Sequence, residues 1–313
     1  MASNTNRIWR DGSFVEWDDA TIHVMSHVVH YGSSVFEGIR CYETPSGPAI
    51  FRLPEHMRRF ADSCRIYRMP LEHSPETLTQ ACIDTVSENG LPHCYLRPVA
   101  VRTGQHMGVF PANAPLEVFI IPWQWGAYLG QAGLSEGVDV CVSSWRRAAP
   151  DTFPSLAKAG GNYLNSQLSL MEARINNYSE GIMLDSFGFV SEGSGENVFV
   201  VREGKIFTST IASAILGGIT RDSVLTIARD LGIQVVEQVI PREMLYIADE
   251  LFFTGTAVEI TPIRSVDRIP IGTGKPGPVS LAIQKEYMGI AKGTIPDRHG
   301  WLTHVPSEVV AGI

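Results

Sequence analysis

A single lysine stands among small and apolar residues near the middle of the chain. The segment SLAKAGGNYLNSQ, residues 155 to 167, places Lys158 between two alanines and directly before two glycines. A lysine becomes nucleophilic when desolvation or a nearby cation lowers its pKa, because the neutral amine can then form a Schiff base with a carbonyl. Most lysines keep their amine in water, so Lys158 alone indicates only a candidate nucleophile.

Two glycine-containing segments carry groups that suit an aromatic, anionic ligand. In VSEGSGENVF, Glu192 precedes glycines and Asn197, and a carboxylate beside an aromatic ring nitrogen keeps that nitrogen protonated. In LGGITRD, two glycines lead into a helix that we expect to begin with Thr220 as its N-cap. Helix N-termini bind anions through backbone N–H groups and the helix dipole. The second segment therefore predicts a phosphate site.

A third segment and an arginine extend the same pattern. FFTGTAVEI places Thr256 just after a predicted strand, and Arg59 lies on a predicted helix that begins after Pro54. A guanidinium is a good phosphate ligand. Together these segments supply an amine for an aldehyde, a carboxylate for a ring nitrogen and several donors for a phosphate. That combination predicts a pyridoxal phosphate site.

The elements that must position these residues follow a mixed α/β order. We expect a helix after Pro54 with Met57, Phe60 and Cys64 on its apolar face, and another with Ser74 as N-cap and Pro75 as its first residue. Leu164, Leu168, Met171 and Ile175 mark a further helix, which continues from the lysine segment. CYLRPVAVR, LEVFIIPW and VDVCVSSW are typical of strands. No G-x-G-x-x-G follows a strand, so we do not expect a nicotinamide-binding fold. We expect a small N-terminal domain over 1–124, a connection over 125–137 and a large cofactor-binding domain over 138–313.

Composition narrows the class of protein. The net charge is −8 and basic residues form no run, which disfavours nucleic acid as a partner. Neither a signal peptide nor a membrane-spanning apolar run is expected, so we predict a cytoplasmic protein. The five cysteines are scattered and show no metal-ligand spacing, and His23, His27 and His30 lack a companion carboxylate. We therefore expect no metal site and structural roles for these histidines.

Ten segments in order resemble one known family, and they run over nearly the whole chain. They are IWRDGSFVEW, HYGSSVFEGIRCY, HMRRFADSCRIYRMP, YLRP, PWQWGAYLG, SSWRRAAP, KAGGNYLNS, SEGSGENVF, GITRD and TGTAVEITPIRSVD. The chain resembles the fold type IV (class IV) aminotransferases, and within them the branched-chain amino acid aminotransferases. The resemblance implies an α/β, two-domain pyridoxal phosphate fold of type IV, like that of D-amino acid aminotransferases.

The resemblance also implies which residues bind pyridoxal 5′-phosphate. Lys158 would bond the cofactor covalently and later move a proton between the substrate and the cofactor. Tyr163 would hydrogen-bond the 3′-oxygen, and Glu192 would pair with the pyridine nitrogen. The implied cofactor-binding residues are Arg59, Lys158, Tyr163, Glu192, Gly195, Asn197, Gly218, Ile219, Thr220 and Thr256.

A second set of residues is implied for the substrate. Tyr95 and Arg97, with the amides that follow Gly255, would handle carboxylates, and aromatic side chains would form apolar walls. A loop around Val109 would reach over from a partner subunit. The implied substrate-binding residues are Tyr31, Phe36, Tyr95, Arg97, Met107, Val109, Trp125, Tyr128, Thr256 and Ala257.

The reaction implied is ping-pong transamination of leucine, isoleucine or valine with 2-oxoglutarate, giving branched-chain 2-oxo acids and L-glutamate. A homodimer or a higher homo-oligomer is implied as well. Two alternatives stay open. One is a D-amino acid or (R)-amine aminotransferase, or an aminodeoxychorismate-type lyase, of the same fold. The other is a non-enzymatic binding protein that keeps the fold.

Overall fold

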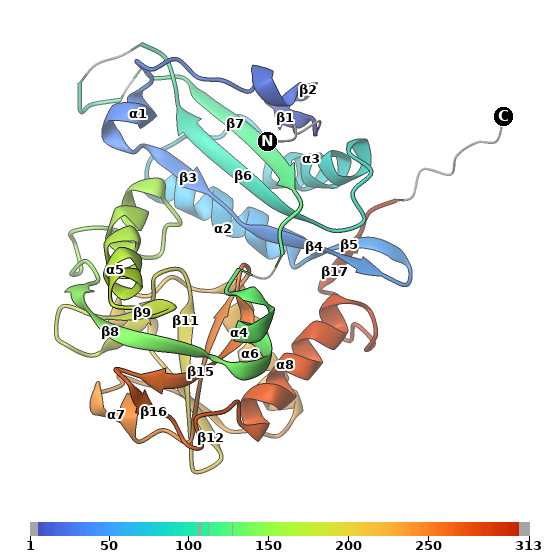
Figure 1. Ribbon diagram of the computed structural model, residues 1–313. Coiled ribbons are helices and arrows are strands. Elements are labelled where there is room, and N and C mark those ends of the chain that lie inside the picture. The colour runs from blue at the N-terminus through green and yellow to red at the C-terminus, as the bar shows by residue number, and fades with distance from the viewer. Residues whose placement is uncertain (1–5, 106–107, 112, 127, 307–313) are drawn as a thin grey trace. The chain divides into compact units, whose positions relative to one another are not determined.

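The chain divides into two compact units. The computed structural model describes residues 6–105, 108–111, 113–126 and 128–306 (Figure 1). Unit 1 comprises Met1–Trp125, Ala157–Gly161 and Ile290–Ile313, and unit 2 comprises Gly126–Leu156 and Asn162–Gly289. The domains expected from the sequence are contiguous, whereas these units are interleaved. The segment that carries Lys158 belongs to unit 1, although it lies far along the chain from the rest of that unit.

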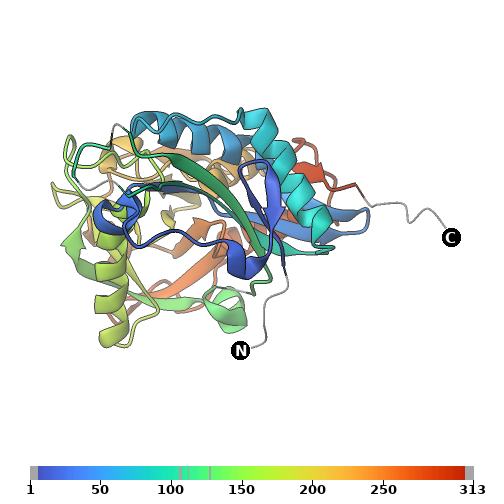
Figure 2. The same ribbon diagram turned by 90° about the horizontal axis from the view of Figure 1, so that it is seen from above.

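Unit 1 is an antiparallel sheet covered on one face by two helices. The strand order is β17 (Leu302–His304), β5 (Gly47–Phe51), β4 (Ile39–Thr44), β6 (Cys94–Arg102), β7 (Leu116–Trp123), β1 (Ile8–Arg10) and β2 (Ser13–Val15), and β3 (Ser34–Phe36) pairs with β6. The helices are α1 (His27–Tyr31), α2 (Leu53–Ile66) and α3 (Pro75–Glu88). Helices α2 and α3 contact each other and lie over the sheet (Figures 1 and 2).

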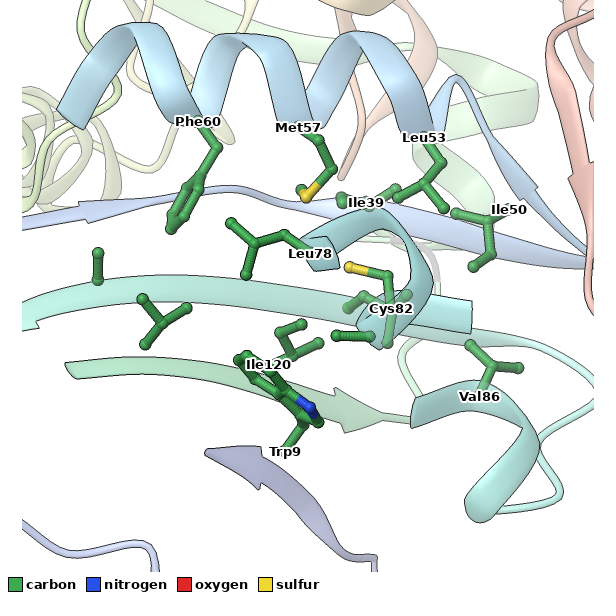
Figure 3. Packing of buried hydrophobic residues seen from close by; sticks show 14 of the residues in the cluster. Trp9, Ile39, Ile50, Leu53, Met57, Phe60, Leu78, Cys82, Val86 and Ile120 are labelled. Carbon is green, nitrogen blue, oxygen red and sulfur yellow. The ribbon is translucent and has the colours of Figure 1, made fainter. Parts of the chain in front are cut away.

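The core of unit 1 follows from the apolar faces of these helices. Met57, Phe60 and Cys64 on α2 are buried, as are Leu78 and Cys82 on α3. Figure 3 shows side chains of both helices meeting those of the strands. The α3 N-terminus is as expected, because the Ser74 side chain accepts a hydrogen bond from Thr77 N and Pro75 is the first helical residue.

Unit 2 is a larger mixed sheet. Its strand order is β10 (Val190–Gly193), β9 (Glu180–Leu184), β8 (Val138–Arg146), β15 (Glu259–Val266), β14 (Glu250–Gly255), β11 (Asn197–Arg202), β12 (Lys205–Thr208) and β13 (Val235–Glu237), and β16 (Ile269–Pro270) pairs with β15. The helices are α4 (Gly130–Glu136), α5 (Tyr163–Ile175), α6 (Ile219–Asp230), α7 (Glu243–Tyr246) and α8 (Pro278–Ala291). Strands β8, β9 and β15 are parallel neighbours, and β10, β11 and β14 are antiparallel.

Two structural details bear on the sequence predictions. Helix α6 begins at Ile219 with Gly218 as its N-cap, so the expected Thr220 cap is wrong. The reason is that Gly218 has the extended backbone of a cap, whereas Thr220 already lies within the helix. All five cysteines are buried free thiols, as expected. Within the described residues, no helix is apolar and long enough to cross a membrane, and no cluster of side chains could hold a metal ion.

Candidate active site

The backbone of Lys158 is held from two sides within unit 1. Its N–H donates to Ser63 Oγ on α2 (3.0 Å), and its carbonyl accepts from Phe36 N on β3 (3.0 Å). A Cβ on Gly160 would overlap Ser34 Oγ, so the close approach to β3 requires glycine there. The small residues around the lysine therefore let its segment lie against β3.

The surroundings of the Lys158 amine change its basicity. Nζ is 5.0 Å from the centroid of the Phe36 ring. Burial and the Arg59 guanidinium lower the pKa of Lys158 to about 8, although the Glu37 carboxylate opposes them. At pH 7 about one amine in ten is then neutral, against about one in three thousand for an ordinary lysine. The amine is available as a nucleophile and as a proton carrier near neutral pH.

Arg59 lies on α2 and is fixed by a buried carboxylate. Its Nε and Nη2 donate to the two oxygens of Glu37 at 2.6 and 2.8 Å. His56 Nδ1, one turn earlier on α2, lies 2.7 Å from Glu37 Oε2. Burial alone would raise the pKa of Glu37, but Arg59 and His56 outweigh it and hold that pKa well below the usual carboxyl range. The group beside Lys158 is therefore a carboxylate bound to two partners.

Aromatic rings on β3, on β6 and just after β7 lie around a second arginine, Arg97. The Arg97 guanidinium lies 4.7 Å from the Phe36 centroid and 5.6 Å from the Tyr95 centroid. The Tyr95 ring is 4.7 Å from that of Trp125 and edge-on to it. Arg97 Nε is buried without a hydrogen-bond partner in the described structure. A buried donor of this kind suits an anionic ligand.

Unit 2 carries the predicted carboxylate for a ring nitrogen. Glu192 Oε1 forms an ion pair with Arg147 (2.9 Å), and Oε2 accepts from Asn197 Nδ2 (3.2 Å) and Leu216 N (2.9 Å). Both side chains of the ion pair are largely buried. These donors favour the ionised form of Glu192 and fix its orientation.

The predicted phosphate loop lies next to this carboxylate. Asn197 Nδ2 also donates to Leu216 O (3.0 Å), and a Cβ on Gly218 would overlap Asn197 Oδ1. Glycine is therefore required where the loop passes over Asn197. The N-cap of α6 is Gly218, which has no side chain to cap the first turn, and the helix begins at Ile219 and includes Thr220. The start of α6 thus presents backbone N–H groups in a form suited to an anion.

The end of β14 brings a further segment to the same edge of the sheet. Thr254 pairs with Asn197 across β14 and β11, and Thr256 and Ala257 follow directly. Thr254 Oγ1 is buried and lacks a hydrogen-bond partner in the described part of the chain. The Thr256 segment therefore follows a strand that pairs with the start of β11, where Asn197 contacts the predicted phosphate loop.

The loop around Val109, which the resemblance assigns to the pocket of a partner subunit, contacts Tyr31 of its own chain. The Tyr31 hydroxyl accepts from Gly108 N (3.2 Å), and His27 Nε2 lies 3.1 Å from Gly108 O. Val109 is 81% exposed. Met107 lies outside the described residues. The Tyr31 ring also contacts the neighbouring His27 and His30.

Three further residues predicted to bind the cofactor or the substrate, Tyr163, Tyr128 and Gly195, belong to unit 2. Tyr163 is the first residue of α5, and Tyr128 packs against the core of unit 2. Gly195 lies in the exposed turn between β10 and β11, where its N–H donates to Glu196 Oε2 (2.9 Å).

Sequence reasoning missed several residues that the structure places around the predicted ones. Glu37, His56 and Ser63 surround Arg59 and Lys158, and Arg147 pairs with Glu192. Each of them stands inside one of the ten segments that carry the family resemblance. The sequence does not show which of these residues bind one another, because the partners lie 19 to 95 positions apart along the chain.

Comparison with known proteins places the chain among aminotransferases. Residues 34–266 match the family described as amino-transferase class IV. The branched-chain-amino-acid aminotransferase of Escherichia coli strain K12 is 52% identical over 299 residues, covering 95% of this chain and 97% of that protein. The crystal structure of the E. coli branched-chain amino acid aminotransferase has a TM-score of 0.95 at 51% identity, covering 97% of this chain and 100% of that one.

A third relative was solved in its cofactor-bound form. It is the branched-chain amino acid aminotransferase of Thermobaculum terrenum in the PLP-form (holo-form), with a TM-score of 0.91 at 36% identity over 97% of this chain and 99% of that one. These matches confirm the predicted α/β fold and the predicted family. They cover nearly the whole chain at high identity, and the chain therefore belongs to the class IV aminotransferase family.

Proposed function

We propose that the protein is a branched-chain amino acid aminotransferase that uses pyridoxal 5′-phosphate. The observation that carries this proposal is the setting of the Lys158 amine, which lies 5.0 Å from the centroid of the Phe36 ring on a segment held between α2 and β3. The relatives of the chain support the proposal, since the proteins that match it over nearly their whole length include the branched-chain-amino-acid aminotransferase of E. coli. Its substrates are leucine, isoleucine or valine, together with 2-oxoglutarate and L-glutamate.

The residues present fit the cofactor. Phosphate needs cationic and N–H donors, which Arg59 and the start of α6 supply. A protonated pyridine nitrogen needs a carboxylate held ionised, and Glu192 has that setting through Arg147. Thr254 Oγ1 is a buried hydroxyl that lacks a protein partner in the described structure. We assign Tyr163, Asn197, Gly195 and Thr256 to the same cofactor site.

Lys158 supplies the amine and moves the proton. When bound, pyridoxal phosphate draws electrons from the α-carbon of an attached amino acid, so that the α-proton becomes acidic. A neutral Lys158 amine would take this proton from the α-carbon of the substrate, and its ammonium form would return a proton to C4′ of the cofactor. The lowered pKa of Lys158 lets one residue serve both steps near neutral pH.

Arg97 and the aromatic rings would handle the two kinds of substrate. The buried Arg97 Nε is a donor for a carboxylate, and Phe36, Tyr95 and Trp125 offer apolar surface for an aliphatic side chain. Gly38 is required beneath Tyr95, because a Cβ there would overlap the Tyr95 hydroxyl. We assign the remaining predicted substrate contacts to Tyr31, Val109, Tyr128 and Ala257.

The function is tested with purified protein and added pyridoxal phosphate. L-Leucine with 2-oxoglutarate should give L-glutamate, and L-leucine alone should convert the visible cofactor absorption to that of pyridoxamine phosphate. D-Alanine and an (R)-amine should do neither at a comparable rate. A protein that responds to D-alanine but not to L-leucine would reassign the substrate within the same family. A protein that takes up no cofactor would favour a binding role.

We also propose that the protein is at least a homodimer, because α5 carries large apolar residues on its outer side. Leu164, Leu168, Met171 and Ile175 are 62%, 39%, 59% and 77% exposed. The buried residues of this helix are small, namely Ser166, Ser169 and Ala173. This distribution is the reverse of an ordinary surface helix. We propose that a second copy of the chain covers this exposed side of α5. The same copy would cover the exposed Val109, which follows Gly108, the residue that donates to Tyr31.

The double substitution Leu168→Glu and Met171→Glu should separate the copies. Each large aliphatic side chain contributes about 1.5–3 kcal/mol when buried, so the loss of two should raise the dissociation constant at least about 100-fold. Light scattering during size-exclusion chromatography should report a dimer or larger for the wild type and a smaller mass for the variant. Leu281→Glu, at an exposed leucine on α8, is the matched control. An unchanged mass in the double variant would exclude α5 from the interface.

A further inference from the structure

A fully buried carboxylate lies next to the proposed active site without a role in the steps above. Glu37 is 0% exposed and follows the last residue of β3. Its oxygens accept from Arg59 and lie 2.7 Å from His56 Nδ1. Its backbone N–H donates to Pro98 O (2.8 Å) and Gly38 N donates to its Oε2 (3.2 Å). Each carboxylate oxygen is therefore engaged within unit 1.

Burying a charged carboxylate such as Glu37 costs free energy. The packing of helix and sheet does not by itself require a charge at this position. A buried ion pair is often no more stabilising than apolar residues of similar volume. Helix α2 already packs on the sheet through Met57 and Phe60. The contact between α2 and β3 therefore does not need a charge.

The position of Glu37 relates it to both supports of Lys158. Phe36, the residue before Glu37, donates to the Lys158 carbonyl from β3. Ser63, on the helix that carries Arg59, accepts from the Lys158 N–H. Glu37 joins β3 to α2 and so ties together the two elements that hold the lysine backbone.

The Glu37 carboxylate also limits the freedom of Arg59. Bonds from both Nε and Nη2 to one carboxylate fix the plane of a guanidinium as well as its position. His56 is kept neutral because burial lowers its pKa more than Glu37 raises it. Its Nδ1 proton is then donated to Glu37, because an ionised carboxylate can only accept. Helix α2 thus presents Arg59 in one orientation.

We propose that Glu37 is a positioning residue for transamination, which fixes the Arg59 guanidinium and joins the two elements that hold the Lys158 backbone. This inference rests on the proposed function, in which Arg59 binds the cofactor phosphate and Lys158 carries the proton. Glu37 itself touches neither the substrate nor the cofactor in this role.

Two substitutions separate the charge of Glu37 from its geometry. Glu37→Gln keeps the size and removes the charge, whereas Glu37→Asp keeps the charge and shortens the reach to Arg59. The charged or titratable groups that face Lys158 are Glu37, then Arg59 and His56 from α2, then Tyr95 and Arg97 from β6. Because Glu37 raises the pKa of Lys158 and Arg59 lowers it, removing the Glu37 charge must lower that pKa.

The first readout is the pH profile of Lys158 modification in the full-length protein after removal of cofactor. Trinitrobenzenesulfonate would be the amine reagent, with the Lys158 peptide followed by mass spectrometry. In Glu37→Gln the midpoint should fall by about one pH unit, and in Glu37→Asp it should stay near that of the wild type. The second readout is the dissociation constant of pyridoxal phosphate, which should rise about tenfold or more in both variants as Arg59 loses its fixed orientation.

Glu250→Gln is the matched control. Glu250 is another buried carboxylate, which accepts from Val279 N and Ser280 N at the start of α8. The Glu250→Gln substitution should lower the melting temperature and leave both readouts unchanged.

If the Glu37 variants also change only the melting temperature, Glu37 is structural and the proposal is wrong. If the wild type binds no pyridoxal phosphate, the proposed function fails and this inference fails with it, whereas Glu37 variants that bind the cofactor as tightly as the wild type overturn this inference alone. If Glu37→Gln does not fold, the affinity of Glu37→Asp for pyridoxal phosphate decides whether Glu37 positions Arg59.

Discussion

Lys158→Ala is expected to lower kcat with L-leucine by at least about 10⁴-fold while pyridoxal phosphate still binds. The substitution removes both the amine that bonds the cofactor and the group that moves the substrate proton. Cofactor affinity should persist in part, because the proposed phosphate ligands, Arg59 and the start of α6, are untouched. Steady-state kinetics would measure kcat, and equilibrium dialysis would measure bound pyridoxal phosphate.

Two comparisons make this result specific to Lys158. Lys285→Ala removes an exposed lysine on α8 and should leave kcat unchanged. A small primary amine added to Lys158→Ala should restore a fraction of the activity, because it can take the place of the missing proton carrier. Ordinary turnover by Lys158→Ala would exclude Lys158 from the chemistry and with it the proposed function.

Glu192→Gln should lower kcat about 10- to 150-fold with the cofactor still bound. Glutamine keeps the shape of the side chain but cannot hold the negative charge that keeps a ring nitrogen protonated. A hydrogen bond to a charged group contributes about 1.5–3 kcal/mol, which sets this range. Single-turnover kinetics with L-leucine would isolate the proton transfer from cofactor binding.

The same substitution also disturbs a buried ion pair, so stability must be followed alongside. Arg147 loses its charged partner, and the melting temperature should fall. Asp139→Asn breaks another arginine pair of unit 2, in which Arg264 binds Asp139 through Nε and Nη2. It should affect stability and leave single-turnover rates near those of the wild type. Equal rate losses in the two variants would mean that Glu192 acts only through folding.

Local sequence was sufficient for the elements and for the kind of chemistry. Ser74 and Pro75 predicted the start of α3, and the apolar spacing at Met57, Phe60 and Cys64 predicted the buried face of α2. These features depend on residues within one or two turns of each other, so they can be read along the chain. The family resemblance rested on ordered segments for the same reason, and the comparisons confirm it.

Helix periodicity identified α5 but not the side of it that is buried. Leu164, Leu168, Met171 and Ile175 have the spacing of a core face, yet they are exposed. Spacing reports that residues share a face of a helix, and only packing decides what that face contacts. The start of α6 was misplaced because Gly218, and not Thr220, has the extended backbone of an N-cap.

The sequence by itself determined the α/β composition, the family and the candidate nucleophile, because each is recorded in short runs of neighbouring residues. Only the tertiary structure decided that Lys158 packs with unit 1, that Glu37 links Arg59 to His56, and that Arg147 faces Glu192. The physical reason is that charge pairs and backbone clamps depend on distances of about 3 Å between segments far apart in the chain. Those distances are set by how strands and helices pack.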